Sequence, residues 1–347
     1  MTAKPILEAK GLAIGYRRRG RVVSAVAGGI EAALPAGRFV CLLGPNGAGK
    51  STLIRTLARM QEPLDGEIFL DGTPLHALPA RALAKQMSLV LTQRVSVGTM
   101  PVLSFVALGR HPYTSWTGRL RQEDEAAVFQ ALADVGIEAL ARRPVCELSD
   151  GERQKVKIAR ALAQEPRVML LDEATAFLDL PHRVELMSLL KRLAHKSGKA
   201  VLLSTHDLDL ALRSADRLWL LAPGGPLREG APEDLVLDDA FSLAFSGGTV
   251  AFDKGSGAFV TATPKKGAVA LQGKGTPAAW TRRALERAGF QVISHGAADV
   301  SVRVERKNER PIWIVGGAKQ CACASIADML VTLNERLGEK QKGDLHE

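Results

Sequence analysis

Short apolar runs and helical repeats of apolar residues alternate along the first 240 residues. Residues 6–34 hold brief apolar runs broken by Gly and Arg, a pattern that predicts antiparallel strands joined by turns. The unbroken apolar run at 39–43 predicts a strand buried on both faces, and the apolar spacing in 52–60 predicts the helix after it. The chain therefore begins with a small β layer, a buried strand and a helix.

Further strands and helices alternate after this point. Residues 66–72, 87–92, 168–172 and 200–205 predict strands, with a helix at 181–194 between the last two. Repeated strand, helix and strand predict a mostly parallel sheet covered by helices. The predicted fold class is therefore α/β.

The region between residues 94 and 165 differs from this repeat. It starts with a segment that contains Gly, Pro and Ser, and it continues as a strongly periodic helix at 123–135. It ends with an amphipathic helix, for which Ser149 is the predicted N-cap. We expect a separable helical insert at about 94–165.

Residues 240–347 extend past the repeat. A Gly- and Lys-rich stretch leads into apolar runs and helical patterns that predict a strand, a helix, several strands and a final helix at about 322–337. We expect this part to regulate the protein or to form a dimer contact. The predicted divisions are a main domain at 1–240, a linker at 241–266, a small α/β accessory domain at 267–338 and a flexible tail at 339–347.

A phosphate-binding loop lies between the predicted strand at 39–43 and its helix. Residues 44–51 match G-x-x-x-x-G-K-[ST], in which glycines let successive backbone N–H groups point at phosphate oxygens. Lys50 would contact the β and γ phosphates, and the Ser51 hydroxyl would bind Mg²⁺. The expected nucleotide contacts in this loop are Gly44, Pro45, Asn46, Gly47, Ala48, Gly49, Lys50, Ser51 and Thr52.

Two carboxylates follow the apolar run at 168–171. The carboxyl ends of parallel strands face the ligand crevice of an α/β sheet, which is also where the phosphate loop lies. Asp172 is expected to hold Mg²⁺, and Glu173 is expected to polarise an attacking water. His206 follows the next strand and is expected to contact the γ phosphate. Tyr16 is expected to stack on the adenine ring, with simple sheet packing as the alternative.

Composition limits the class of protein. Hydrophobic residues make up 46% and charged residues 24% of the 347 residues, as in soluble globular proteins. The first ten residues lack the apolar segment of a signal peptide, and the longest uncharged stretch, Val95–Gly109, is too short to span a bilayer. We therefore expect the chain to stay in the cytoplasm.

The net charge of +9 would suit a nucleic-acid or membrane-surface partner. The basic residues are spread along the chain, however, and the tight run consists of Arg17, Arg18, Arg19 and Arg21. A solvated loop explains this run, and a loop that faces phosphates or an anionic leaflet is the alternative.

These motifs together resemble the nucleotide-binding subunit of an ATP-binding cassette (ABC) transporter. The resemblance spans about residues 5–240 and rests on GPNGAGKST at 44–52, Gln93, LSDGERQ at 148–154, VMLLDEAT at 168–175, Asp179 and His206. It implies a P-loop ATPase fold with an N-terminal antiparallel β layer, and a head-to-tail homodimer that closes around two ATP molecules.

The resemblance also implies roles for residues outside the phosphate loop. Ser149, Gly151 and Glu152 would contact the nucleotide held by the partner subunit. Asp179 would lie at the dimer seam. Gln93 would bind Mg²⁺, take part in catalysis and report the γ phosphate to the helical insert.

The chain departs from the family pattern at two positions. Asp150 replaces the second glycine of LSGGQ, and Ala174 replaces the proline of DEPT. An acidic side chain beside incoming phosphates would weaken closure by charge repulsion. Because Lys50, Glu173 and His206 are intact, we expect a working ATPase.

GRHPYTSWTGRL at 109–120, GERQKVKIARALAQEP at 151–166 and STHDLDLALRSADR at 204–217 resemble the ATPases of importers for ferric siderophores, haem and cobalamin. This resemblance implies two copies on a dimeric membrane permease, at the cytoplasmic face of the inner membrane. A periplasmic binding protein would deliver the substrate. The segment from Arg94 to Trp116 would form the groove that receives the permease.

Two other functions fit parts of the sequence. A soluble cassette ATPase acting on nucleic acid or ribosomes would suit the positive charge and the extra domain. The single cassette and the predicted permease groove favour transport, and no nucleic-acid partner is expected. A nucleotide sensor with low turnover would suit Asp150 and the accessory domain.

Overall fold

The computed structural model describes residues 5–18, 21–93, 97–245, 250–261, 266–293, 298, 300–307, 310–316 and 320–343, of which 307 and 338–343 are described in backbone only. The chain divides into two compact units, residues 1–260 and residues 261–347. The predicted boundary at residue 240 therefore moves about twenty residues toward the C-terminus. Each unit has a hydrophobic core of its own.

A six-stranded sheet organises the first unit. Its strands are β3 (Phe39–Leu43), β6 (Met87–Val90), β7 (Val168–Asp172), β8 (Ala200–Ser204), β9 (Arg217–Leu221) and β10 (Leu227–Gly230), in the order β10-β9-β3-β8-β7-β6. All neighbours are parallel except β10, which pairs antiparallel with β9. The predicted mostly parallel α/β sheet is confirmed, and the carboxyl ends of its strands meet at one edge.

The apolar runs of these strands supply two cores, one on each face of the sheet. In β3, Phe39 and Cys41 pack in the same core as Leu190 of α6. Val40 and Leu42 pack on the other face, in the same core as Ile54 of α1. Because successive side chains of a strand point to opposite faces, a strand covered on both sides needs an unbroken apolar run. The run at 39–43 has this explanation.

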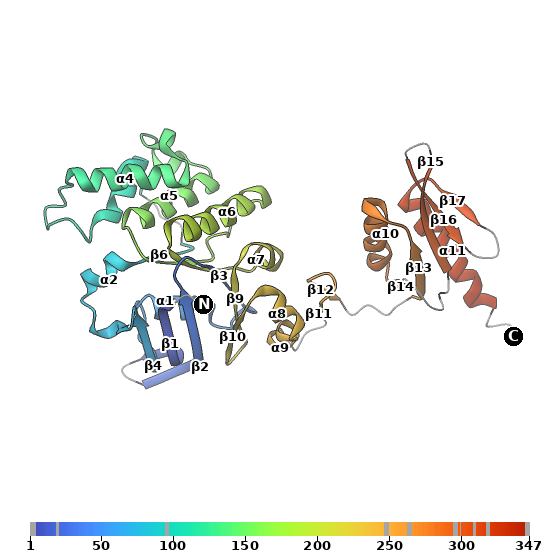
Figure 1. The fold of residues 1–347 in the computed structure, drawn as a ribbon, viewed down its shortest axis with the longest axis horizontal. Coiled ribbons are helices and arrows are strands. Elements are labelled where there is room, and N and C mark those ends of the chain that lie inside the picture. Colours follow the sequence, from blue (N-terminus) through green and yellow to red (C-terminus); the bar gives the residue numbers. More distant parts are fainter. Residues whose placement is uncertain are drawn as a thin grey trace. The chain divides into compact units, whose positions relative to one another are not determined.

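An antiparallel sheet covers one face. It contains β1 (Pro5–Arg18), β2 (Arg21–Pro35), β4 (Asp65–Leu70) and β5 (Thr73–Pro74), in the order β2-β1-β4-β5. Residues 6–34 thus form two long strands paired as a hairpin. In Figure 1 these blue strands and the green helical insert lie on opposite sides of the six-stranded sheet.

The insert lies between β6 and β7. Its α-helices are α3 (Val102–Ala107), α4 (Gln122–Val135) and α5 (Asp150–Ala163), and its 3₁₀ turns are η2 (Leu108–Arg110), η3 (Glu138–Leu140) and η4 (Val145–Glu147). The other helical elements of this unit are α1 (Lys50–Leu57), η1 (Leu75–Ala77), α2 (Ala80–Gln86), α6 (Leu180–Ser197), α7 (Leu208–Ser214), α8 (Pro232–Leu237) and α9 (Ala240–Ala244). Helix α1 ends before Met60, because Arg59 has a left-handed backbone with φ of 56°.

The segment expected as a linker at 241–266 has regular structure in its first part. Helix α9 is followed by the hairpin of β11 (Val250–Asp253) and β12 (Ala258–Thr261). The ring of Phe252 stacks on Phe241 at 4.8 Å between centroids, and both belong to the main core. Aromatic burial therefore fixes this segment to the first unit. The sequence does not reveal this, because the turn of the hairpin is rich in Gly and Lys.

The second unit is a five-stranded sheet with two helices. Its elements are β13 (Ala268–Gln272), α10 (Gly275–Arg287), β14 (Gln291–Ile293), β15 (Val300–Lys307), β16 (Arg310–Gly316), β17 (Cys321–Cys323) and α11 (Ile326–Gly343), with strand order β14-β13-β15-β16-β17. The predicted final helix starts later than expected, because Cys321–Cys323 is extended and pairs with β16. Residues 339–343 of the expected tail continue α11, and 344–347 lie outside the described residues.

Candidate functional site

The phosphate loop joins β3 to α1, at the edge where the carboxyl ends of the parallel strands meet. Gly44 has φ of 156°, and a Cβ at this position would lie 2.3 Å from the carbonyl oxygen of Leu221. Gly49 has φ of 101°, and a Cβ there would lie 2.4 Å from Cγ1 of Val26. Only glycine fits these two positions without displacing its neighbours.

Lys50 is the first residue of α1 and is 5% exposed. Its Nζ donates to the carbonyl oxygens of Gly44 at 2.8 Å and Pro45 at 3.1 Å, so the ammonium lies across the loop. Burial lowers the pKa of Lys50, and the negative charges of Glu173 and Asp172 act in the opposite direction. A buried cation thus lies between a backbone cup and two carboxylates.

Asp172 ends β7 and is 3% exposed. Its Oδ1 accepts hydrogen bonds from Ser51 Oγ at 2.9 Å and from Ser204 Oγ at 2.8 Å. The hydroxyl of Thr92 donates to the carbonyl oxygen of Asp172 at 2.7 Å. A hydroxyl and a carboxylate in contact are the hard oxygen donors that Mg²⁺ prefers, so Ser51 and Asp172 fit this ion.

Glu173 has a left-handed backbone, with φ of 48°, which is uncommon outside glycine. Its N–H donates to Ser204, to the hydroxyl at 2.9 Å and the carbonyl oxygen at 3.2 Å. The side chain turns to His206, where Oε1 lies 2.5 Å from Nε2. The strand end thus points the Asp172 carboxylate at Ser51 and the Glu173 carboxylate at His206.

Several cavities border the phosphate loop and its neighbours in the described part of the chain, and two of them bear on nucleotide binding. One of about 550 Å³ is lined by Tyr16, Arg17, Arg55 and Gln93, among others. Tyr16 is 46% exposed, and its hydroxyl lies 3.1 Å from Oγ1 of Thr52. An exposed ring fixed to the phosphate loop has the placement that the stacking interpretation requires.

The second cavity, of about 370 Å³, lies beside the phosphate loop. Its walls include residues 44–46 and His206, and also Phe245, Val250 and Phe259 of the segment after residue 240. The C-terminal segment of the first unit therefore forms part of the surroundings of the site, which the sequence did not predict.

Helix α5 starts away from the phosphate loop, in the insert. Ser149 caps it: its Oγ accepts from the N–H of Glu152 at 3.2 Å, and the Glu152 carboxylate accepts from the N–H of Ser149 at 2.9 Å. This backbone hydrogen bond lowers the pKa of Glu152. The Asp150 carboxylate lies 3.0 Å from the Arg153 guanidinium, so part of its charge is balanced within the same helix turn.

Asp179 caps α6 and accepts a hydrogen bond from the N–H of His182 at 3.2 Å. The His182 ring also contacts this carboxylate, and that contact lowers the pKa of Asp179. The cap places Asp179 on an exposed surface.

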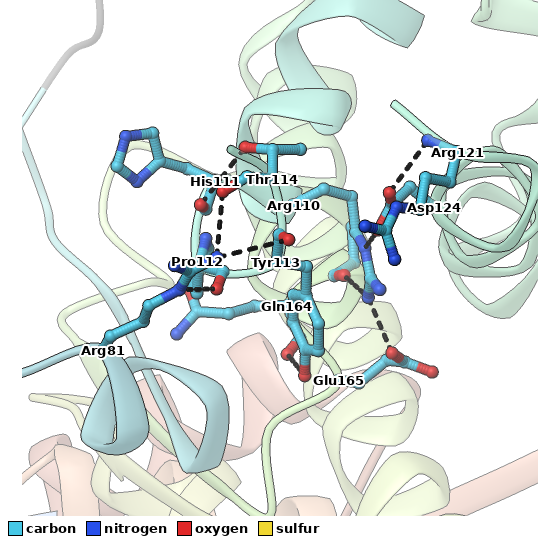
Figure 2. Close-up of polar contacts among 11 residues, drawn as sticks. Arg81, Arg110, His111, Pro112, Tyr113, Thr114, Arg121, Asp124, Gln164 and Glu165 are labelled. Carbon is cyan, nitrogen blue, oxygen red and sulfur yellow. Dashed lines mark hydrogen bonds and ion pairs between the residues drawn. The ribbon is translucent and has the colours of Figure 1, made fainter. Parts of the chain in front are cut away.

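The predicted permease groove begins at Arg94, which lies outside the described residues together with 95 and 96. Figure 2 shows residues 110–114 of this segment, which are held from two sides. Arg110 is 3% exposed and contacts Asp124 at 2.9 Å and Glu165 at 2.6 Å. Its guanidinium also lies 3.8 Å from the centre of the Tyr113 ring.

Contacts from α2 complete this network. Arg81 donates to the carbonyl oxygens of Pro112 at 2.8 Å and Thr114 at 2.9 Å. Hydrogen bonds from the backbone of Arg121 and from Arg110 lower the pKa of Asp124. The turn 110–114 is therefore held by contacts from the insert on one side and from α2 on the other.

The structure brings together most residues that the sequence singled out. Lys50, Ser51, Asp172, Glu173 and His206 converge at one edge, and Tyr16 and Gln93 share a cavity beside them. The hydroxyl of Ser149 bonds within its own helix cap, and the cap of Asp179 is likewise local.

The sequence did not identify Thr92, Ser204 or Lys157 as site residues. Thr92 and Ser204 contact Asp172, and Lys157 donates to the carbonyl oxygen of Gln93 at 2.9 Å. The position of Ser204 at a strand end was a usable signal, since polar residues at these ends face the crevice. Lys157 gave no signal, because its helix is amphipathic and lysine is common on solvent faces.

Two protein-family models match the chain. The model described as ABC transporter matches residues 28–176, and the model described as iron ABC transporter C-terminal domain matches residues 266–334. Within the described residues, no helix combines the length and the apolar character that crossing a membrane requires.

Individual proteins are similar over about two thirds of this chain. An uncharacterized ABC transporter ATP-binding protein of Methanocaldococcus jannaschii is 43% identical over 231 residues, which cover 67% of this chain and 78% of the relative. The ferric enterobactin transport ATP-binding protein of Escherichia coli is 38% identical over 230 residues, 66% of this chain and 83% of the relative. A solved dimeric bacterial ABC transporter cassette matches with a TM-score of 0.56 and 27% identity, over 65% of this chain and 98% of that chain.

Proposed function

Because the chain belongs to the family of ABC transporter ATP-binding proteins, we propose that it is the ATP-hydrolysing subunit of an importer for a ferric siderophore or a related iron chelate. The observation that carries the ATPase role is the convergence of Lys50, Ser51 and Asp172 with the Glu173–His206 pair. The match of residues 266–334 to an iron transporter domain supports an iron-containing cargo.

Each residue has a chemical task in this proposal. Backbone N–H groups of the loop and the Lys50 ammonium bind the β and γ phosphates, while the Tyr16 ring stacks on adenine. Ser51, Asp172 and Gln93 would hold Mg²⁺, which neutralises charge on the phosphates. These contacts fix the triphosphate at the strand edge.

Hydrolysis then needs a base and a partner for the γ phosphate. The Glu173 carboxylate accepts a proton from the attacking water, and the water oxygen bonds to the γ phosphorus as the bond to the bridging oxygen breaks. His206 donates to the γ phosphate and orients Glu173 through the 2.5 Å contact. The products are ADP and inorganic phosphate.

We further propose that two copies close head to tail around two nucleotides. Ser149, Gly151 and Glu152 of one copy contact the nucleotide bound by the other, where the N-terminal end of α5 favours negative charge. Asp179 lies at the seam. The similarity to a dimeric cassette supports this arrangement.

The permease is the proposed membrane partner, at the cytoplasmic face of the inner membrane. The surface around 97–116 receives it, since the Arg110 network makes this surface rigid enough to transmit force to the insert. A periplasmic binding protein acts indirectly, by delivering the chelate to the permease. The C-terminal unit serves as an accessory domain.

Two measurements test the proposal. Steady-state ATP hydrolysis should fall at least about 100-fold in Glu173→Gln, as expected when a general base is lost, while ATP binding persists. Uptake of radioactive ferric siderophore should stop in a deletion strain and return with the wild-type gene but not with Glu173→Gln. Unchanged hydrolysis in the variant would contradict the catalytic assignment. Loss of haem or cobalamin uptake, with ferric siderophore uptake intact, would contradict the cargo.

A further inference from the structure

Helix α5 carries two buried polar side chains that the proposed function does not use. Lys157 is 7% exposed and Gln154 is 8% exposed, although they lie beside the apolar residues Val156 and Ile158, which are fully buried. Burying an ammonium or an amide is unfavourable unless the group has a polar partner. An aliphatic residue would fill such positions at lower cost in stability.

Lys157 has its partner in the loop after β6. Its Nζ donates to the carbonyl oxygen of Gln93 at 2.9 Å. The neighbouring residue, Thr92, donates to the carbonyl oxygen of Asp172 at 2.7 Å. Gln93 is therefore bonded to α5, and its neighbour Thr92 is bonded to β7, the strand that holds the magnesium ligand. The position of Gln93 depends on both hydrogen bonds.

Gln154 lies one turn before Lys157 on the same helix. Its Nε2 is buried and has no hydrogen-bond partner within the part of the chain that the structure describes. A buried donor without an acceptor lowers stability by about 1–3 kcal/mol in general, so an acceptor near the Gln154 amide would be favourable. A small gap of about 20 Å³ lies beside this amide, and Thr92, Gln154, Lys157 and Glu173 all line it.

We propose that Lys157 and Gln154 are positioning residues for Gln93 and Glu173 of their own subunit. The helix whose first residues reach the partner's nucleotide would then also set the geometry of its own catalytic centre. Lys157 lies seven positions after Asp150, about 10 Å along one unbroken helix, so a displacement at the cap reaches Gln93 directly. This inference rests on the proposed function, and it adds communication between the two nucleotide sites.

Kinetics of the full-length protein test this role. Lys157→Met keeps most of the length of the side chain and removes its donor, and Gln154→Leu replaces the amide with an apolar side chain one atom shorter. Misplacement of a reacting group by about 1 Å can lower a rate 100-fold, so we expect kcat for ATP to fall about 10- to 100-fold in Lys157→Met. The KM should stay within about twofold, because the phosphate loop is untouched. The Hill coefficient for ATP should fall toward one.

Two variants serve as controls. Lys157→Arg retains a charged donor and should recover most of the lost kcat. Lys155→Met removes a half-buried lysine of the same helix, which contacts Glu185 at 2.7 Å, and should behave as wild type. Thermal unfolding of each variant shows whether lost activity reflects lost folding.

Three outcomes decide the matter. A folded Lys157→Met with unchanged kcat, or a raised KM at normal kcat, would overturn the positioning role. A loss of kcat that Lys157→Arg does not restore would also overturn it. A wild-type protein without ATPase activity would overturn the proposed function and this role with it. If the wild type is active, an unchanged Lys157→Met overturns only the positioning role.

Discussion

The Oγ of Ser51 lies 2.9 Å from Oδ1 of Asp172, although 121 positions separate the two residues in the sequence. The contact joins the start of α1 to the end of β7, two elements that the parallel sheet brings to one edge. Both groups are oxygen donors suited to Mg²⁺. The protein therefore holds this pair of ligands together by its own hydrogen bonds.

Asp172→Asn tests the magnesium role. The amide oxygen can still accept from Ser51 and Ser204, but the negative charge is lost, so the Mg²⁺ concentration for half-maximal ATPase should rise roughly 10- to 100-fold. ATP affinity measured in EDTA should stay within about twofold. Asp209→Asn, at an exposed aspartate paired with Arg213, is the control. A magnesium dependence like that of wild type would contradict the assignment.

Tyr16→Ala should weaken ATP binding about 5- to 100-fold, since stacking of a base on an aromatic ring contributes about 1–3 kcal/mol. Tyr16→Phe retains the ring and loses only the contact with Thr52, so its Kd should stay within about tenfold of wild type. Binding of inorganic tripolyphosphate should be equal in all three proteins. Equal ATP affinity in wild type and Tyr16→Ala would show that the ring only packs on the sheet.

Substitutions at Asp150 and Arg153 test what the departure from the family pattern does to dimerisation. Its carboxylate lies 3.0 Å from the Arg153 guanidinium, which offsets part of the repulsion expected toward incoming phosphates. Arg153→Ala should therefore raise the ATP concentration needed for dimerisation, and Asp150→Gly should lower it. Because exposed pairs contribute less than about 1 kcal/mol, each change should be about fivefold or less. An Asp150→Gly protein that dimerises less readily would contradict the repulsion argument.

Much of the first unit followed from residue patterns with short-range causes. The run at 39–43 needs cover on both faces, and Ser149 is the N-cap that the sequence predicts, to which the structure adds a reciprocal hydrogen bond from Glu152. The phosphate loop and the carboxylates at the end of β7 follow from the chemistry of anions and of strand ends.

The remaining features depend on contacts distant in sequence. Cys321–Cys323 is a strand because Trp313 and Val315 of β16 pair with it, which an isolated stretch of small residues does not reveal. Phe252 fixes the hairpin after α9 by stacking on Phe241. The burial of Lys157 depends on a carbonyl 64 residues away.

Asp124→Asn tests the buried network around Arg110. The change removes the negative charge that faces the buried Arg110 guanidinium. Breaking a buried ion pair lowers the free energy of unfolding by about 3–5 kcal/mol. Asp134→Asn, on the exposed side of the same helix, is the control and should change stability by less than about 0.5 kcal/mol. Urea unfolding at pH 7 measures both. Equal midpoints for the two variants would contradict a stabilising role.

The same residue predicts a pH dependence. Hydrogen bonds lower the pKa of Asp124 in the folded protein, so its contribution is complete above the unfolded value of about 4 and is lost as pH falls through the folded pKa. Wild type should therefore lose stability relative to Asp124→Asn as the pH falls below about 4. A constant difference between the two proteins from neutral to acid pH would contradict this linkage.

The central claim is that each nucleotide lies between the phosphate loop of one copy and Ser149 of the other. Disulfide cross-linking between Asn46→Cys and Ser149→Cys tests it most directly, in a Glu173→Gln background with Cys146 and Cys321, the two cysteines that are not buried, replaced by serine. The claim predicts a covalent dimer of twice the 37.1 kDa chain that forms with MgATP and requires both new cysteines. No cross-link with MgATP, or an equal yield without nucleotide, would contradict it.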